Sequence, residues 1–192
     1  MVTSGHVSLV QKWNIRMEPG NVIWITGISG SGKTTLGRRI TNWLRENGEM
    51  VVFLDGDELR KIFDGGSKFD YQSRLSLSVS YSKLCKILSD SGLTVVICTI
   101  SLFHFVHRWN RENISHYVEV FIDAPLNLVR SRDPKGIYEK YFKGELSNVS
   151  GLDIDAEYPA NPHIKLNVDL KTDVEDSLEQ FKRKFKTNKF SK

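Results

Sequence analysis

Five short apolar runs recur along the chain and predict β-strands. They occupy residues 21–26, 50–55, 93–100, 117–123 and, more weakly, 164–169. The first four are rich in Val and Ile and lack a regular polar alternation, which is typical of parallel strands buried on both faces. The pattern therefore predicts a parallel sheet with little exposed surface.

Helical spacing fills the intervals between several of these runs and follows the last one. Apolar side chains recur every three or four residues over residues 34–47, 77–91 and 173–186, and a glycine follows each of the first two segments. Strands and helices alternate along the chain, an order that favours an α/β fold with right-handed crossovers and helices covering the sheet. Because 192 residues suit one core, we expect a single domain over residues 1–192.

Three segments stand outside the alternation. Residues 1–19 read as an N-terminal extension, and residues 173–192 as a C-terminal helix with a basic tail. Residues 133–162 are rich in Lys, Gly, Asn and Asp with little periodic pattern, and so long an irregular region in a compact domain predicts a mobile lid or binding loop.

Charge and cysteine content narrow the range of partners. Six Lys or Arg lie in residues 182–192, so the net charge of +4 belongs to the tail and the rest of the chain is slightly acidic. We favour a solvated tail over contact with nucleic acid or membrane, and no apolar run approaches the roughly 18 residues of a membrane span. Cys85 and Cys98 lie within apolar segments, which predicts buried free thiols and, with no secretory pattern at the start, a cytoplasmic location.

A glycine-rich turn directly after the first apolar run carries the strongest chemical signal. "GISGSGKT" fits the eight-residue phosphate-loop pattern, between a predicted strand and a predicted helix. Its glycines allow successive amide groups to point at anionic oxygens, and the helix N-terminus adds positive potential. The lysine can neutralise the outer phosphates and the threonine hydroxyl can reach Mg²⁺. We therefore expect ATP and Mg²⁺ to bind a P-loop NTPase-like fold through Gly27, Ile28, Ser29, Gly30, Ser31, Gly32, Lys33, Thr34 and Thr35.

Two carboxylates follow the second apolar run, in "FLDGDELR". Asp55 and Asp57 would lie at the carboxyl edge of the sheet, where open α/β folds bind ligands. One can face the metal and the other a substrate hydroxyl. The alternative is a solvated turn with acidic caps, which the neighbouring phosphate loop makes less attractive.

At this point the chain resembles the adenylylsulfate kinase family over roughly residues 20–169. The matches are "IWITGISGSGKTT", "LDGDELR", an arginine five residues after Phe69, "ISLF", "VEVFIDAPL" and "RDPKGIY" followed by "GEL". The resemblance implies transfer of the ATP γ-phosphoryl group to the 3′-hydroxyl of adenylyl sulfate. The resemblance also implies that the protein can form a homodimer.

Residue roles follow from that resemblance position by position. It implies Asp57 on the attacking hydroxyl, Asp55 with Thr34 at the metal, and Ser101 at a position where a phosphorylated intermediate has been considered, although direct in-line transfer needs only positioning and charge neutralisation. Lys33 and Lys135 join these residues as catalytic candidates, and Arg132 is expected at the adenine of ATP or in a local pair. For the acceptor, the resemblance implies Asp57, Arg60, Phe69, Arg74, Ile100, Ser101, Lys135, Gly136, Ile137 and Val149.

The acceptor half departs from the family pattern. Arg74 is followed by "LSLSVS" where the family has Glu-Glu-Asn-Ile-Arg-Arg, and Val149 replaces the aromatic partner of Phe69. The lost cation, amide and ring weaken binding of an anionic purine nucleotide. Adenylyl sulfate is our default acceptor, and another nucleotide such as cytidine diphosphoramidate, used in surface-polysaccharide modification, is the main alternative. A non-catalytic nucleotide-binding protein is the third.

Overall fold

The five predicted strands form one parallel sheet. The computed structural model describes residues 18–63 and 69–187, so most of the N-terminal extension and the end of the basic tail fall outside the described residues. The sheet order is β2-β3-β1-β4-β5. Its strands are β1 (Val22–Thr26), β2 (Val51–Asp55), β3 (Thr94–Cys98), β4 (Tyr117–Asp123) and β5 (Ile164–Asn167).

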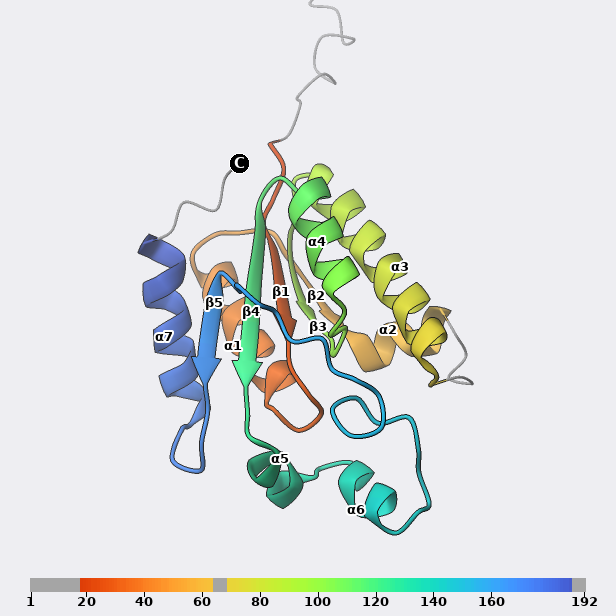
Figure 1. Cartoon of the computed structure of the whole chain (residues 1–192). Helices are drawn as coiled ribbons and strands as arrows, with labels where there is room; N and C mark the ends of the chain where they lie inside the picture. Colours follow the sequence, from red (N-terminus) through yellow and green to blue (C-terminus); the bar gives the residue numbers. More distant parts are fainter. Residues whose placement is uncertain (1–17, 64–68, 188–192) are drawn as a thin grey trace, which may run out of the picture.

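Helices cover both faces of this sheet (Figure 1). Helices α1 and α7 pack on one face, and α3 and α4 on the other. The sequence predicts α1, α7 and all but the first six residues of α3, but not α2, α4, α5 or the short α6 inside the irregular segment 133–162. The helices are α1 (Lys33–Glu46), α2 (Gly56–Phe63), α3 (Tyr71–Asp90), α4 (His104–Asn113), α5 (Leu126–Arg132), α6 (Ile137–Phe142) and α7 (Val174–Thr187).

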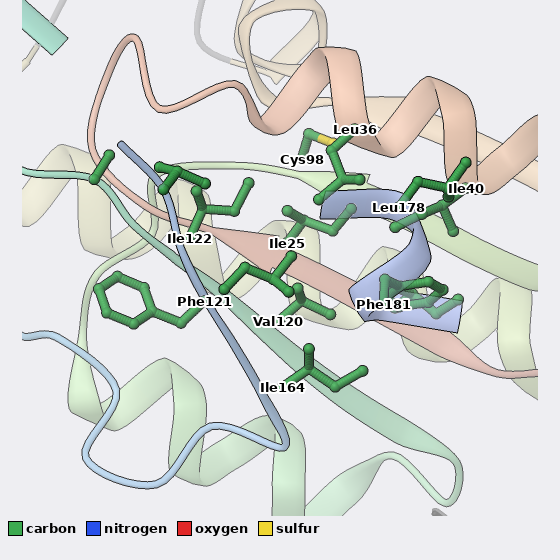
Figure 2. Close-up of a cluster of buried hydrophobic side chains, with 14 of the residues drawn as sticks. Ile25, Leu36, Ile40, Cys98, Val120, Phe121, Ile122, Ile164, Leu178 and Phe181 are labelled. Atoms are coloured by element: carbon green, nitrogen blue, oxygen red, sulfur yellow. The ribbon is translucent and has the colours of Figure 1, made fainter. Parts of the chain in front are cut away.

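The central strand divides its side chains between two cores. Ile23 and Ile25 of β1 belong to the cluster under α1 and α7, part of which Figure 2 shows, whereas Val22 and Trp24 belong to the cluster under α3 and α4. All four are fully buried. A run buried on both faces carries apolar residues at odd and even positions alike, which is why this strand shows no alternation in the sequence.

Strand β2 differs from the prediction that it is buried on both faces. It lies at the edge of the sheet, pairs only with β3, and its five residues are all half-buried. The prediction was wrong because strand order is a property of the whole sheet, and a local apolar run does not encode it. The edge position matters for function, because β2 delivers Asp55 and Asp57 to the end of the sheet.

The carboxyl ends of the strands share one edge, where the connecting segments gather. Figure 1 shows the loop between β1 and α1, and helices α2, α5 and α6, beyond or beside the arrowheads of the strands. The two thiols, Cys85 and Cys98, are buried and free, as predicted. No helix within the described residues is both long and apolar enough to cross a membrane.

Candidate active site

The loop between β1 and α1 has the backbone that its glycines predict. Gly32 adopts φ +93° and caps α1, a conformation that costs an L side chain strain. Gly27 adopts φ +152°, and a Cβ there would lie 2.8 Å from the carbonyl oxygen of Ile122. The loop therefore closes tightly against β4 and directs the N-terminus of a 14-residue helix at its own concave side.

Lys33 opens helix α1 and folds back over the loop. Its Nζ donates to the carbonyl oxygen of Ile28 at 2.7 Å. Burial lowers the pKa of Lys33 from 10.5 to about 8, and the nearby carboxylates of Asp57 and Asp55 oppose the shift only in part. A desolvated ammonium group interacts more strongly with incoming negative charge than a solvated one. Lys33 is therefore suited to bind phosphate oxygens.

Asp55 and Thr34 form a second contact at the same edge. The Thr34 hydroxyl donates to Asp55 Oδ2 at 2.8 Å, and the Asp57 amide donates to Asp55 Oδ1 at 2.9 Å. One carboxylate and one hydroxyl at this separation are oxygen donors of the kind that Mg²⁺ accepts, with water completing the shell. The pair fits the expected metal position beside the phosphate loop.

Asp57 and Lys135 bring two distant segments together. Asp57 lies in the first turn of α2, and its carboxylate forms an ion pair with Nζ of Lys135, which precedes α6. Both side chains are more than half exposed. The pair lies close enough to Lys33 for both charges to act on its pKa. The carboxylates of Asp57 and Asp55 and two ammonium groups therefore share this part of the molecule.

The acceptor candidates Arg60, Phe69 and Arg74 cluster around one ring. The guanidinium carbons of Arg60 and Arg74 lie 4.6 Å and 5.3 Å from the centre of the Phe69 ring. Arg74 donates through Nε to the carbonyl of Phe69 and through Nη2 to the carbonyl of Asn148, both at 2.7 Å. Burial, followed by the charge of Arg60, lowers the pKa of Arg74. The two cations make this end of the site attractive to an anion.

Ser101 occupies a strained position just beyond β3. Its φ of +27° is unusual for a residue with a side chain, and it is only 5% exposed. Its hydroxyl lies 2.7 Å from those of both Ser78 and Thr99, and its carbonyl lies 3.0 Å from Nε2 of His107. Contacts from α3, α4 and the end of β3 thus hold this residue in place.

One cavity of about 880 Å³ joins the phosphate loop to the acceptor candidates. This volume is near the upper end of the roughly 300–1,000 Å³ range of small-molecule sites. The structure does not place Gly27, Ile28, Gly136 or Val149 in its lining; Val149 is buried, and Ser150 lines the cavity in its place. The predicted residues that line it are Ser29, Gly30, Ser31, Gly32, Lys33, Thr34, Thr35, Asp55, Asp57, Arg60, Phe69, Arg74, Ile100, Ser101, Arg132, Lys135 and Ile137.

Several lining residues were missed by the sequence analysis. Ser78 and Thr99 flank Ser101, and Thr172, Asp173 and Ser177 extend the lining to the start of α7. Ser78 follows Arg74 by one helical turn, a spacing that could have placed both on one face of α3. The residues near α7 come from the far end of the sequence and carry no motif.

Comparison with known proteins identifies the family. The sequence profile of adenylylsulphate kinase matches residues 19–167. The chain belongs to this family. A solved relative is the Mycobacterium tuberculosis APS kinase CysC in complex with AMPPNP and APS, with a TM-score of 0.80 at 29% identity over 88% of this chain and 98% of that one. The chain is accordingly an ATP-dependent phosphotransferase of the adenylylsulphate kinase type with a nucleotide as substrate.

Curated relatives differ in the acceptor that their names state. An adenylyl-sulfate kinase of Rippkaea orientalis is 36% identical over 161 residues, covering 84% of this chain and 88% of that protein. A cytidine diphosphoramidate kinase of Campylobacter jejuni is 35% identical over 158 residues, covering 82% and 92%. A Sinorhizobium meliloti gluconokinase, at 17% identity and a TM-score of 0.57, shares the fold alone. Family membership therefore leaves the acceptor open.

Proposed function

We propose that this adenylylsulphate kinase relative transfers the γ-phosphoryl group of ATP to the ribose 3′-hydroxyl of a nucleotide, by default adenylyl sulfate. The observation that carries the proposal is the ion pair of Asp57 and Lys135 in the cavity that also contains the phosphate loop. Phosphoryl transfer needs positioning and charge neutralisation more than covalent chemistry. The cavity offers a carboxylate for the attacking hydroxyl and ammonium groups for the transferred charge.

Each residue has a part in the proposed transfer. Asp57 accepts a hydrogen bond from the 3′-hydroxyl and aligns its oxygen for in-line attack. Lys33 and Lys135 bind phosphate oxygens and stabilise the charge that spreads over them in the transition state. ATP supplies the phosphoryl group, and Mg²⁺, held by Thr34 and Asp55, would neutralise its phosphates. Arg60 and Arg74 bind the anionic end of the acceptor, and Phe69 stacks on its base.

A specific departure favours cytidine diphosphoramidate as a second candidate acceptor. Phe69 has no aromatic partner at position 149, where Val149 is buried beside the cavity. A pyrimidine needs less stacking surface than a purine, and a phosphoramidate terminus presents two charge-bearing oxygens and an N–H group where a sulfate presents three oxygens, so it needs fewer cationic contacts. The Campylobacter jejuni relative whose name states this acceptor supports keeping both candidates.

The decisive experiment measures ADP release with the two acceptors side by side. Turnover with adenylyl sulfate supports the default, and preference for cytidine diphosphoramidate replaces it. Asp57→Asn should reduce kcat by at least about a hundredfold while nucleotide still binds. Asp90→Asn is the matched control, because Asp90 pairs with Lys86 on α3, away from the cavity. Nucleotide binding without transfer to either acceptor would favour a binding protein instead.

The wider organisation is part of the same proposal. We propose one domain in which residues 133–162 form a mobile lid that closes over both ligands, and a cytoplasmic protein that can form a homodimer. The lid carries Lys135, and Tyr138 donates from α6 to the carbonyl of Ser29 at 2.9 Å, so its position is coupled to the phosphate loop. Protection of this segment from limited proteolysis by ATP would support closure, and unchanged cleavage would contradict it.

A further inference from the structure

Three hydroxyl groups form a chain along the acceptor half of the cavity. Thr99 Oγ1 and Ser101 Oγ lie 2.7 Å apart, as do Ser101 Oγ and Ser78 Oγ. Ser78 Oγ in turn lies 2.8 Å from the carbonyl oxygen of Arg74. All three hydroxyl residues line the cavity and are less than 8% exposed. We call Thr99, Ser101 and Ser78 the hydroxyl chain.

The direction of every proton in this chain is fixed by its last member. A carbonyl oxygen can only accept, so Ser78 gives its single proton to Arg74. Ser101 must then donate to Ser78, and this uses the only proton that Ser101 has. Thr99 must therefore donate to Ser101. The protons run from Thr99 through Ser101 and Ser78 to the backbone of α3.

This direction decides what the hydroxyl chain can offer a ligand. Its three protons are all engaged within the protein, whereas lone pairs on its oxygens remain available, because each hydroxyl oxygen can accept twice. A sulfate or phosphate oxygen, which only accepts, gains no hydrogen bond here. An N–H group gains one.

We infer that the hydroxyl chain makes Ser78 a specificity-determining residue that selects an acceptor nucleotide with an N–H donor facing it. The inference rests on the proposed nucleotide kinase function and refines its acceptor. Two sources share this chemistry: an exocyclic amino group on the base, or an amide on the terminal phosphorus. The chain begins beside Gly56, where an added Cβ would lie 3.2 Å from Thr99 Oγ1, and ends at Arg74. The hydroxyl chain thus extends from Gly56, next to Asp57, to Arg74, which is proposed to bind the anionic end of the acceptor.

Four acceptors separate the two sources. Cytidine and uridine, each as the diphosphoramidate and as the 5′-phosphosulfate, combine a base with or without an amino group and a terminus with or without N–H. Calorimetric binding to the full chain gives an affinity for each compound whether or not it turns over, and ADP release is measured separately. We expect the N–H group that faces the chain to improve affinity about tenfold, the usual effect of one buried hydrogen bond.

Substitution of Ser78 changes the hydroxyl chain from a hydrogen-bond acceptor into a hydrogen-bond donor toward the cavity. Ser78→Ala leaves the proton of Ser101, or that of Thr99 if Ser101 turns to it, without an internal acceptor, so the cavity gains a donor. The N–H preference should disappear, and the compound lacking N–H should bind more tightly than it does to the unmodified protein. Thr99→Val removes the first hydroxyl but leaves Ser101 donating to Ser78, so the preference should persist.

Ser82→Ala is the matched control. Ser82 is buried on the same helix and donates to the carbonyl of Ser78 at 3.1 Å, the same type of hydrogen bond that Ser78 makes to Arg74. Unlike Ser78, it does not line the cavity. Equal preference in the unmodified protein and Ser78→Ala overturns the inference, and so does failure of all four compounds to bind. Absence of ADP release with these four compounds and with adenylyl sulfate, while selective binding is intact, contradicts the kinase proposal alone.

Discussion

The buried carboxylate of Glu119 provides a stringent test of how the site is supported. Glu119 lies on β4, is fully buried, and forms an ion pair with Nη2 of Arg111 on α4. Tyr117 donates to its Oε1 at 3.2 Å, and Nδ1 of His107 lies 3.8 Å away. His107 in turn contacts the carbonyl of Ser101. The Glu119 carboxylate is therefore connected through His107 to Ser101, the strained residue that lines the cavity.

Arg111→Ala should destabilise the fold by about 3 kcal/mol. Removing one partner of a buried pair typically costs about 3–5 kcal/mol, because the remaining charge is left without compensation. The lower end applies because the Arg111 side chain is 36% exposed. Replacing the charge as well, in Arg111→Ala with Glu119→Gln, removes the uncompensated charge and should recover at least about 1 kcal/mol relative to the single variant.

Urea unfolding of the four proteins in this cycle gives the midpoints and slopes that measure these free energies. The key result is that the double variant is more stable than Arg111→Ala alone. If the two substitutions simply add, or if Arg111→Ala costs less than about 1 kcal/mol, the carboxylate does not depend on this arginine and the reasoning fails.

Three further predictions concern packing and pH. Gly37→Ala should cost about 1–3 kcal/mol despite the better helix propensity of Ala, because its Cβ would lie 2.3 Å from Cys98 Sγ; adding Cys98→Ala should restore much of the loss in thermal unfolding. Phe181→Ala removes a fully buried ring from the cluster under α7 and should cost about 3–5 kcal/mol, measured by urea unfolding against an exposed Arg183→Ala change on the same helix. Burial lowers the pKa of His107 below 6.5, so as the pH falls the unfolded chain takes up a proton before the folded protein does, and the free energy of unfolding decreases below pH 6.5. His107→Gln should make this decrease smaller between pH 7 and 5. An unchanged dependence on pH would exclude His107 as its source.

The sequence predicts the donor half of the site better than the acceptor half. Lys33, Thr34 and Asp55 lie next to strands whose apolar runs are unmistakable, and parallel strands bring their carboxyl ends to one edge. Local pattern and tertiary position therefore agree. The start of α3 was missed because its first turn is stabilised by a cap, Asp70 accepting from the amide of Ser73 at 3.0 Å, and has no apolar periodicity.

Ser78 shows why the acceptor half was harder to predict. Ser76, Ser78 and Ser80 alternate with apolar residues and look equivalent in the sequence. Only the phase of α3 distinguishes them: Ser76 is exposed, Ser80 half-buried and Ser78 buried at the cavity. The strained backbone of Ser101, which completes their arrangement, comes from contacts with α3 and α4 that no local motif specifies.

Arg74 has a double attachment that bears on how this site could change during evolution. Its guanidinium joins the carbonyl of Phe69 to that of Asn148, residues far apart in the sequence, so it fastens the loop before Val149 to the start of α3. Replacing it would loosen two segments at once, whatever the acceptor. Within the described residues, the departing positions Leu77, Val79 and Ser80 make no side-chain hydrogen bond to another segment. We therefore expect relatives with new acceptors to keep Arg74 and to differ at these neighbouring positions of α3.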